Sequence, residues 1–414
     1  MPDDGGRGFL PNPSRLLFLQ GPPGRLWGEL GEACRQAGFE VFKIHQCLPE
    51  ELGWPGPGTR FRGQGAAWAE WLADYCRSNA ITDILYYADR LPDHVEAAQV
   101  ADRLGIRAWV IENGYLRPDW LTFEPFGMSA FSRLPLEAER IQSLADDLPE
   151  PDLSPRYGHG FRQEGGAEVL YGLLQSLGKT RYPEYRADRY YAPLQDYVSW
   201  ALRTAQWIRG AATRTRLLPK LLQGDIRFTL LAMQLQSDYQ IRSSSPYDAL
   251  SDMLAEVIAS FAVSAPSDRH LVVKGHPLDN GWENWPRHLR WISRDHGVSE
   301  RVHWLDGGPL PLLIDQAESL ITVNSTVGLK GILQNCPVLA LGSAVYNRPG
   351  LTHQGEIDRF WTDPEKIDSS FQAQFLRALI AWGQVRGSFY DPRGRTNAVK
   401  EIVNRLKMVQ ICGE

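Results

Sequence analysis

The chain alternates between short apolar runs and amphipathic stretches at helical spacing. In its first part, the apolar runs that are typical of strands are RLLFLQ at 15–20, FEVFKIH at 39–45, ITDILYYAD at 81–89 and IRAWVIENGY at 106–115. The helical patterns between them are LWGELGEACRQAG at 26–38, AAWAEWLADYCRS at 66–78 and DHVEAAQVADRLG at 93–105. Strands that alternate with helices in this way predict βαβ units and a parallel sheet.

The same alternation resumes after Gly224. The expected strands are IRFTLLAMQL at 226–235, HLVVKGHP at 270–277, RVHWLDG at 301–307, ESLITVNS at 318–325 and CPVLALG at 336–342. The expected helices are SDMLAEVIASFAVSA at 251–265, LPLLIDQA at 310–317 and TVGLKGILQN at 326–335. The sequence therefore predicts a second α/β unit, and two such units bury a cleft that the carboxyl ends of their strands face.

The segment between these two parts is aromatic, basic and helical in its spacing. From Leu202 to Leu222 it carries five basic residues and no acid, namely Arg203, Arg209, Arg214, Arg216 and Lys220. Such a stretch is usually a solvated helix face packed on its aromatic side, and anionic membrane headgroups are the alternative. The expected organisation is a tail at 1–14, an N-terminal Rossmann-like domain at 15–148, a helical insertion at 149–224, a C-terminal Rossmann-like domain at 225–380 and a helical tail at 381–414.

Composition narrows the class of protein. The 414 residues have ordinary apolar and charged fractions and a net charge of −5, which gives no global argument for nucleic acid. The five cysteines lack CxxC or metal spacing and fit a reducing cytoplasm. No stretch reaches the roughly 18 uncharged apolar residues of a membrane span. We therefore expect any work on a membrane to be done from its surface.

Polar residues that follow the expected strands are the candidate site residues. Ser325 and Thr326 follow one strand and begin a helix. They are either an N-cap or, together with the free amides of the helix start, a site for one phosphate. The chain has no GxxxxGK[ST] and no GxGxxG, so a mononucleotide or a single phosphate is the better interpretation.

Three further strand ends carry ionisable groups. Lys274 and His276 leave a strand just before Pro277, where both can donate to a phosphate, although a histidine is often merely structural. Glu112 ends another strand and is followed by Arg117, so the carboxylate is either a base, acid or nucleophile or one half of a salt bridge. Asp89 beside Arg90 has the same two interpretations.

Several segments together resemble the capsule polysaccharide biosynthesis family of Gram-negative bacteria, the KpsS/KpsC type. The matching segments are QGPPG, YADRLPDH, IENGYLRPDWLTFE, LQSDYQIRSSSPY, VVKGHPLDNG, VNSTVGLKGIL and PVLALGSAVYNRPGLTHQGEIDRFW. They cover the chain from about Leu16 to Trp361, and the last two are highly specific. A single module and the LRPDW segment make the chain more similar to the single-module KpsS type than to the two-module KpsC type.

The resemblance implies a GT-B-type glycosyltransferase with two Rossmann-like halves. Members of the family use CMP-β-Kdo as donor and extend a lysophosphatidylglycerol-type lipid, with retention at the anomeric centre, to initiate the linker of the capsule polymer. The resemblance also implies peripheral attachment to the inner face of the cytoplasmic membrane, other capsule assembly proteins as partners, no nucleic acid, no cofactor and no metal. The alternative is a non-catalytic export or scaffold component that binds the glycolipid. A donor with a diphosphate, such as a UDP-sugar, would need a second set of phosphate-binding residues.

The resemblance assigns roles to individual residues. His276, Ser325 and Thr326 would hold the CMP phosphate, with Lys274 and Asn324 beside them. Glu112 stands at the acidic position of the family and Arg117 at its basic position. Related modules have a second acid where this chain has Asn113, so Asp89 remains a catalytic candidate. The possible substrate contacts are Gln20, Gln236, Asp238 and His353.

Overall fold

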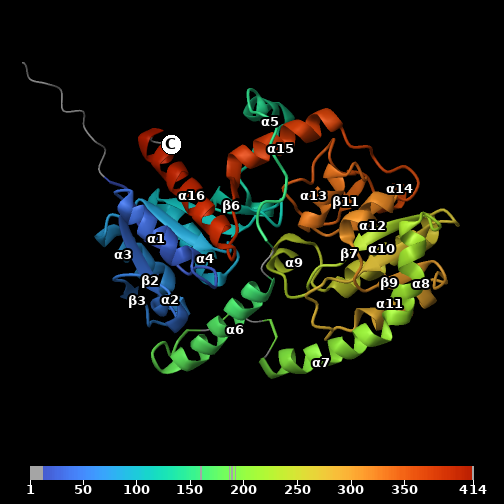
Figure 1. Cartoon of the computed structure of the whole chain (residues 1–414), viewed down its shortest axis with the longest axis horizontal. Helices are drawn as coiled ribbons and strands as arrows, with labels where there is room; N and C mark the ends of the chain where they lie inside the picture. The colour runs from blue at the N-terminus through green and yellow to red at the C-terminus, as the bar shows by residue number, and fades with distance from the viewer. Residues whose placement is uncertain (1–12, 159–160, 186, 188–189, 192, 413–414) are drawn as a thin grey trace, which may run out of the picture. The chain divides into compact units, whose positions relative to one another are not determined.

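The computed structural model describes residues 13–158, 161–185, 187, 190–191 and 193–412. The chain divides into two compact units, one of residues 1–133, 152–188 and 382–414, the other of residues 134–151 and 189–381. The expected N-terminal tail at 1–14 lies outside the described residues except for Pro13 and Ser14. Both units are mixed α/β, as predicted (Figure 1).

A seven-stranded sheet forms the centre of the first unit, in the order β12-β6-β5-β4-β1-β2-β3. Its strands are β1 (Arg15–Phe18), β2 (Glu40–His45), β3 (Thr59–Arg60), β4 (Asp83–Tyr87), β5 (Arg107–Asn113), β6 (Trp120–Pro125) and β12 (Gln384–Arg386). Its helices are α1 (Leu26–Gln36), α2 (Leu48–Leu52), α3 (Trp68–Ser78), α4 (Pro92–Leu104), α6 (Phe161–Leu177) and α16 (Pro392–Cys412). The pairs β5–β6 and β6–β12 are antiparallel, whereas the pairs from β5 to β3 are parallel.

The core of the first unit joins the two ends of the chain. Alternate residues of the central strands, such as Phe18, Leu85 and Ile111, form one apolar cluster with residues of α1 and α16. Helix α16, red in Figure 1, packs beside α1, which is blue. On the surface of this contact Arg395 of α16 donates to both carboxylate oxygens of Glu29, each at 3.0 Å. The C-terminal segment is therefore an integral part of this unit.

The second unit is built on a five-stranded parallel sheet in the order β11-β10-β7-β8-β9. Its strands are β7 (Phe228–Ala232), β8 (His270–Lys274), β9 (Val302–Leu305), β10 (Ser319–Thr322) and β11 (Val338–Ala340). Its helices are α5 (Ala138–Ala145), α7 (Pro193–Arg209), α8 (Ala211–Leu222), α9 (Tyr239–Ser244), α10 (Leu250–Ser264), α11 (Trp285–Asp295), α12 (Leu310–Gln316), α13 (Thr326–Leu333), α14 (Ile357–Phe360) and α15 (Ser369–Gly383). Every residue of β7 is buried, as expected of a central parallel strand.

The structure differs from the sequence expectations in several places. Residues 134–148 were expected in the N-terminal domain but belong to the second unit, and strand β3 was not expected. The expected insertion at 149–224 is helical, but α6 belongs to the first unit and α7 and α8 belong to the second. Strand β6 was not expected, because LTFE is a short run that directly follows a turn. The expected helical tail at 381–414 also contains strand β12, which pairs with β6. A strand of three residues is too short to show a readable alternation.

Candidate functional site

Polar residues gather where three neighbouring strands of the second unit end. Asn324 and Ser325 follow β10, Gln234 follows β7, and Lys274 and His276 lie at the end of β8. These strands are adjacent in the order β10-β7-β8. Since neighbouring strands lie about 4.8 Å apart, the ends of β10 and β8 are separated by roughly 10 Å. The structure thus brings the predicted phosphate-binding residues to one edge of this sheet.

Ser325 is the N-cap of α13. Its hydroxyl oxygen accepts a hydrogen bond from the Val327 amide at 3.2 Å, and Thr326 is the first residue of the helix. The Tyr346 hydroxyl donates to the Ser325 carbonyl and lies against Gly328, where a Cβ would be 2.3 Å from the tyrosine oxygen. Capping and phosphate binding are compatible, because a helix start has several orphan amides and a positive dipole end.

Asn324 is held by the protein itself. Its side-chain oxygen accepts from the Gln234 amide group at 2.9 Å, and its backbone N–H donates to Gln234 Oε1 at 3.0 Å. Its Nδ2 donates to the Gln240 carbonyl at 2.9 Å. Asn324 therefore ties the end of β10 to the end of β7, and these contacts favour a structural role over a ligand contact.

Lys274 and His276 present donors at the end of β8. Lys274 is only 6% exposed, and burial lowers the pKa of its ammonium group, partly offset by the negative charge of Asp306. His276 is half-buried, and its Nδ1 accepts from the Leu278 amide at 3.1 Å. The neutral imidazole therefore carries its proton on Nε2, the tautomer that can donate to a phosphate oxygen.

Gln236 and Asp238 anchor the chain that follows β7. The Gln236 side chain accepts from the Leu250 amide at 2.8 Å and donates to the Asp248 carbonyl at 3.3 Å. Asp238 caps α9 by accepting from the Gln240 amide at 2.9 Å. Both side chains thus have structural partners at the positions where substrate contacts were predicted.

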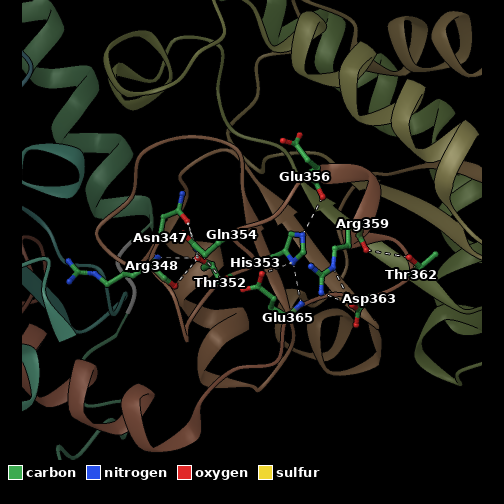
Figure 2. Close-up of polar contacts among 10 residues, drawn as sticks. All are labelled: Asn347, Arg348, Thr352, His353, Gln354, Glu356, Arg359, Thr362, Asp363 and Glu365. Atoms are coloured by element: carbon green, nitrogen blue, oxygen red, sulfur yellow. Dashed lines mark hydrogen bonds and ion pairs between the residues drawn. The ribbon is translucent and has the colours of Figure 1, made fainter. Parts of the chain in front are cut away.

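His353 is 2% exposed and ties the loop after β11 together. Its Nδ1 accepts from the Glu365 amide at 3.3 Å, so the ring proton is on Nε2, which lies 3.3 Å from the Glu356 carbonyl oxygen. Figure 2 shows both contacts, together with the neighbouring hydrogen bond from the Thr352 hydroxyl to Asn347. Both ring nitrogens are used by the backbone, which favours a structural role for this histidine.

The candidate residues of the first unit include carboxyl groups, whereas those of the second unit are mainly hydrogen-bond donors. Glu112 is half-buried near the end of β5, and its Oε1 accepts from the backbone and side-chain amides of Asn113 at 2.8 and 3.2 Å. Burial raises the pKa of Glu112 to about 7, against the opposing effects of these hydrogen bonds and of Arg117. A carboxyl group that titrates near neutral pH is matched to proton transfer.

A second carboxyl group with the same property lies on the same face of the sheet. In the antiparallel pair β5–β6, Glu112 is opposite Thr122 and Val110 is opposite Glu124, so both glutamates point the same way. Glu124 is fully buried, accepts from the Ser132 hydroxyl, and has a pKa that burial raises to about 7. It was missing from the predicted site, although the two-residue alternation in LTFE was the available signal.

The other candidates of the first unit have local partners. Asp89 is 2% exposed, accepts from the Met128 amide at 3.0 Å and pairs with Arg90 at 3.4 Å, and burial raises its pKa. Arg117 is exposed in the turn between β5 and β6. Gln20 follows β1, and its side-chain oxygen lies 3.4 Å from the Tyr185 hydroxyl. Asp89 therefore combines a buried carboxyl group with a role in holding the loop after β6.

A family model described as capsule polysaccharide biosynthesis protein matches residues 82–390. The chain belongs to the capsule polysaccharide biosynthesis family. Within this family it is 30% identical to the capsule polysaccharide export protein KpsS of Escherichia coli, over 91% of this chain and 97% of that protein. It is 27% identical to the capsule polysaccharide modification protein LipB of Neisseria meningitidis serogroup B, over 92% and 93% of the two chains.

Among solved structures, the chain is similar to a Thermosulfurimonas dismutans KpsC structure described as a β-Kdo 2,7 transferase. The identity is 16%, the coverage is 95% of this chain and 99% of that chain, and the TM-score is 0.46. The capsule polysaccharide biosynthesis match includes both candidate clusters, with Glu112 near its beginning and Ser325 in its second half. Gln20 lies before it.

Proposed function

We propose that this capsule polysaccharide biosynthesis protein is a glycosyltransferase. It moves β-Kdo from CMP-β-Kdo to a lysophosphatidylglycerol-type lipid and so initiates the capsule linker. In this proposal the chain has the GT-B fold. The observation that carries the proposal is that several groups able to donate hydrogen bonds to a phosphate lie together at the strand ends of the second unit. The chemistry of transfer falls to the carboxyl groups of the first unit.

The donor groups of the second unit fit one phosphate. Lys274, His276 and the amides at the start of α13 each contribute hydrogen-bond donors, and Ser325 and Thr326 add hydroxyl groups. A CMP-sugar carries a single phosphate, whereas UDP-sugars carry two. Because lysine, imidazole and helix-end amides can stabilise the leaving phosphate, the proposed reaction needs no metal ion.

The transfer step follows from the chemistry of the donor. The bond between the anomeric carbon of Kdo and the phosphate oxygen breaks, and CMP leaves with the bonding electrons. A bond forms to the acceptor hydroxyl oxygen, whose proton goes to Glu112. Retention of configuration requires two displacements with a carboxylate nucleophile in the first. We assign that role to Asp89, which follows β4 next to β5. Its carboxylate oxygen bonds to the anomeric carbon as CMP leaves, and this bond breaks in the second displacement when the acceptor oxygen takes its place.

The decisive experiment combines the purified chain, CMP-β-Kdo generated in the reaction from CTP and Kdo, and a lysophosphatidylglycerol analogue. We expect a product heavier than the acceptor by one Kdo in the mass spectrum, and no product when CTP is omitted. Binding of the glycolipid without any transfer would instead favour the non-catalytic export component. The experiment therefore separates the two classes of function.

Helix α7 provides a surface for attachment to the inner leaflet. Its exposed side chains include Trp200, Trp207 and Ile208, at 44, 42 and 67% exposure, and Arg209 is exposed beside them. Arg216 is exposed on α8. Exposed tryptophans next to basic residues match the interface of an anionic bilayer, so we include peripheral attachment in the proposal. Within the described part of the chain, no helix is long and apolar enough to cross a membrane.

A further inference from the structure

Helix α7 also contacts the loop that carries His276. We call residues 276–284, which follow β8, the HP loop. The guanidinium group of Arg203 on α7 donates through Nε to the Asp279 carbonyl at 3.0 Å, and Gln206 donates to the Gly281 carbonyl at 3.0 Å. Gly281 has φ of +80°, and a Cβ there would lie 3.2 Å from the Arg203 Cα. The loop and the helix therefore lie in direct contact.

Arg203 binds a third segment with its other two nitrogens. Nη2 donates to Asp306 Oδ1 at 2.6 Å and Nη1 donates to Asp306 Oδ2, at the end of β9. Arg203 is 8% exposed and Asp306 is 5% exposed, so this is a buried bidentate pair. One guanidinium group thus joins α7, the HP loop and the end of β9.

The hydrogen bonds of the HP loop extend this contact to His276. The Asp279 amide donates to the His276 carbonyl at 3.1 Å, and the Leu278 amide donates to the His276 ring at 3.1 Å. The turn from His276 to Asp279 is therefore one hydrogen-bonded unit, and Arg203 holds its far end. A displaced turn would move the imidazole with it.

The Arg203–Asp306 pair also affects Lys274. The negative charge of Asp306 acts on Lys274, since it opposes the lowering of the lysine pKa by burial. With Arg203 in place, the carboxylate of Asp306 is occupied by the guanidinium group.

We infer that Arg203 is the positioning residue of the phosphate-binding cluster. It holds the HP loop so that His276 faces the donor phosphate. This inference rests on the proposed binding of a CMP-sugar by the second unit. Helix α7 of the basic segment would then have two roles. Its buried side holds the HP loop, and its exposed side forms the proposed surface for membrane attachment.

The test must separate positioning from stability. Removing one partner of a buried ion pair leaves an uncompensated charge and destabilises the fold, whereas apolar replacement of both partners is often tolerated. The main variant is therefore Arg203→Met with Asp306→Leu, which replaces both partners of the pair. The matched control is Arg227→Met, because Arg227 is an exposed arginine paired with Asp268 and Glu318 before β7, at the opposite end of that strand.

Two measurements on the full chain test whether Arg203 holds the HP loop and whether it supports CMP binding. In hydrogen–deuterium exchange without ligand, we expect amides of 278–284 to exchange at least tenfold faster in the double variant than in the wild type or in Arg227→Met. In calorimetric titration with CMP, we expect at least tenfold weaker binding by the double variant. Arg203→Lys keeps a charge for Asp306 but lacks the planar fork that also reaches Asp279, so it should recover part of the CMP affinity.

Each contrary result has a definite meaning. Unchanged exchange in the HP loop would show that Arg203 does not hold it, and the inference would be wrong. Faster exchange with wild-type CMP affinity would leave Arg203 a structural residue only and would also overturn the inference. If the wild-type chain itself does not bind CMP, the proposed donor site fails and the positioning role fails with it. A loss of CMP affinity that is confined to the double variant, together with faster exchange in its HP loop, supports both the proposed donor site and the positioning role of Arg203.

Discussion

The candidate residues of the two α/β units have opposite chemistry. In the first unit, burial holds the pKa of both Glu112 and Glu124 near 7, so their charged forms are disfavoured. In the second unit, the strand ends present an ammonium group, an imidazole and helix-start amides. The difference follows from topology, because the antiparallel hairpin β5–β6 brings two carboxyl groups to one face, while the parallel strand β10 leads directly into the start of α13. The proposed function assigns proton transfer to one unit and anion binding to the other.

The largest expected effect tests the acidic side of this division. We expect Glu112→Gln to lower the rate of Kdo transfer by about 10²- to 10⁴-fold, because the amide cannot accept the acceptor proton. CMP affinity should stay at the wild-type value, since the groups proposed to donate hydrogen bonds to the phosphate lie in the second unit. Transfer assays and CMP titration of the same preparation measure the two. Glu70→Gln, an exposed glutamate of α3, is the control, and full activity in Glu112→Gln would remove this residue from the mechanism.

The same group predicts a pH dependence. Glu112 must be ionised to accept a proton, and its pKa is raised to about 7, so kcat/KM should fall as the pH drops below about 7. This acidic limb should be absent from the residual activity of Glu112→Gln. A limb that persists unchanged in that variant would assign the titration to another group.

Glu124 predicts a pH effect on stability rather than on activity. Its pKa in the folded state is raised from 4.5 to about 7, so its contribution is fully present below pH 4.5 and is lost as the pH rises through 7. The shift corresponds to about 3 kcal/mol. We expect the free energy of unfolding, measured with urea at pH 5 and pH 8, to fall less with pH in Glu124→Gln than in the wild type. An identical pH dependence of the two proteins would contradict this.

A smaller effect is expected on the basic side. We expect His276→Ala to weaken CMP binding by about tenfold or more, because one hydrogen bond to a charged group contributes about 1.5 to 3 kcal/mol. His288→Ala on α11 removes an exposed histidine of the same unit and serves as the control. If CMP binds both variants with equal affinity, the division between an acidic unit and an anion-binding unit does not hold.

The smallest effect concerns the surface of α7. Reversing Arg209 and Arg216 to Glu should weaken sedimentation with anionic vesicles, since each basic residue near such a surface contributes about 1 kcal/mol. Binding to neutral phosphatidylcholine vesicles should change little. Reversal of Arg77 and Arg103, which are paired with Asp74 and Glu70, is the matched control. Unchanged binding of the α7 variant to anionic vesicles would exclude this surface.

Most strands of the fold could be predicted from sequence, because buried parallel strands such as β7 and β8 are continuous apolar runs bounded by turns. The strands β6 and β12 were missed for a physical reason. Their place depends on pairing with each other and with β5, and Val385 lies opposite Leu121 although more than half the chain separates them. Short strands of this kind form because they pair with neighbouring strands, and the local sequence alone does not indicate them.

The candidate site was harder to predict, because a polar residue at a strand end does not reveal its partners. Asn324 is tied to Gln234, and His353 is tied to backbone groups of a following loop. Arg203 was counted among the basic residues of a surface, yet its carboxylate partner is Asp306 in a distant strand end. The sequence predicted that these residues lie at one edge of the second sheet, and only the contacts separate structural polar groups from candidate ligand groups.

Strand β12 has a consequence for the order in which a newly made chain can fold. Because β12 and α16 follow the second unit along the chain, the first unit lacks an edge strand and part of its core until these two elements have left the ribosome. The residues of the second unit are all made before then. Until β12 pairs with it, β6 presents an unpaired edge that can pair with strands of other chains. Deletion of residues 384–412 should therefore yield a chain whose second unit folds while its first unit aggregates.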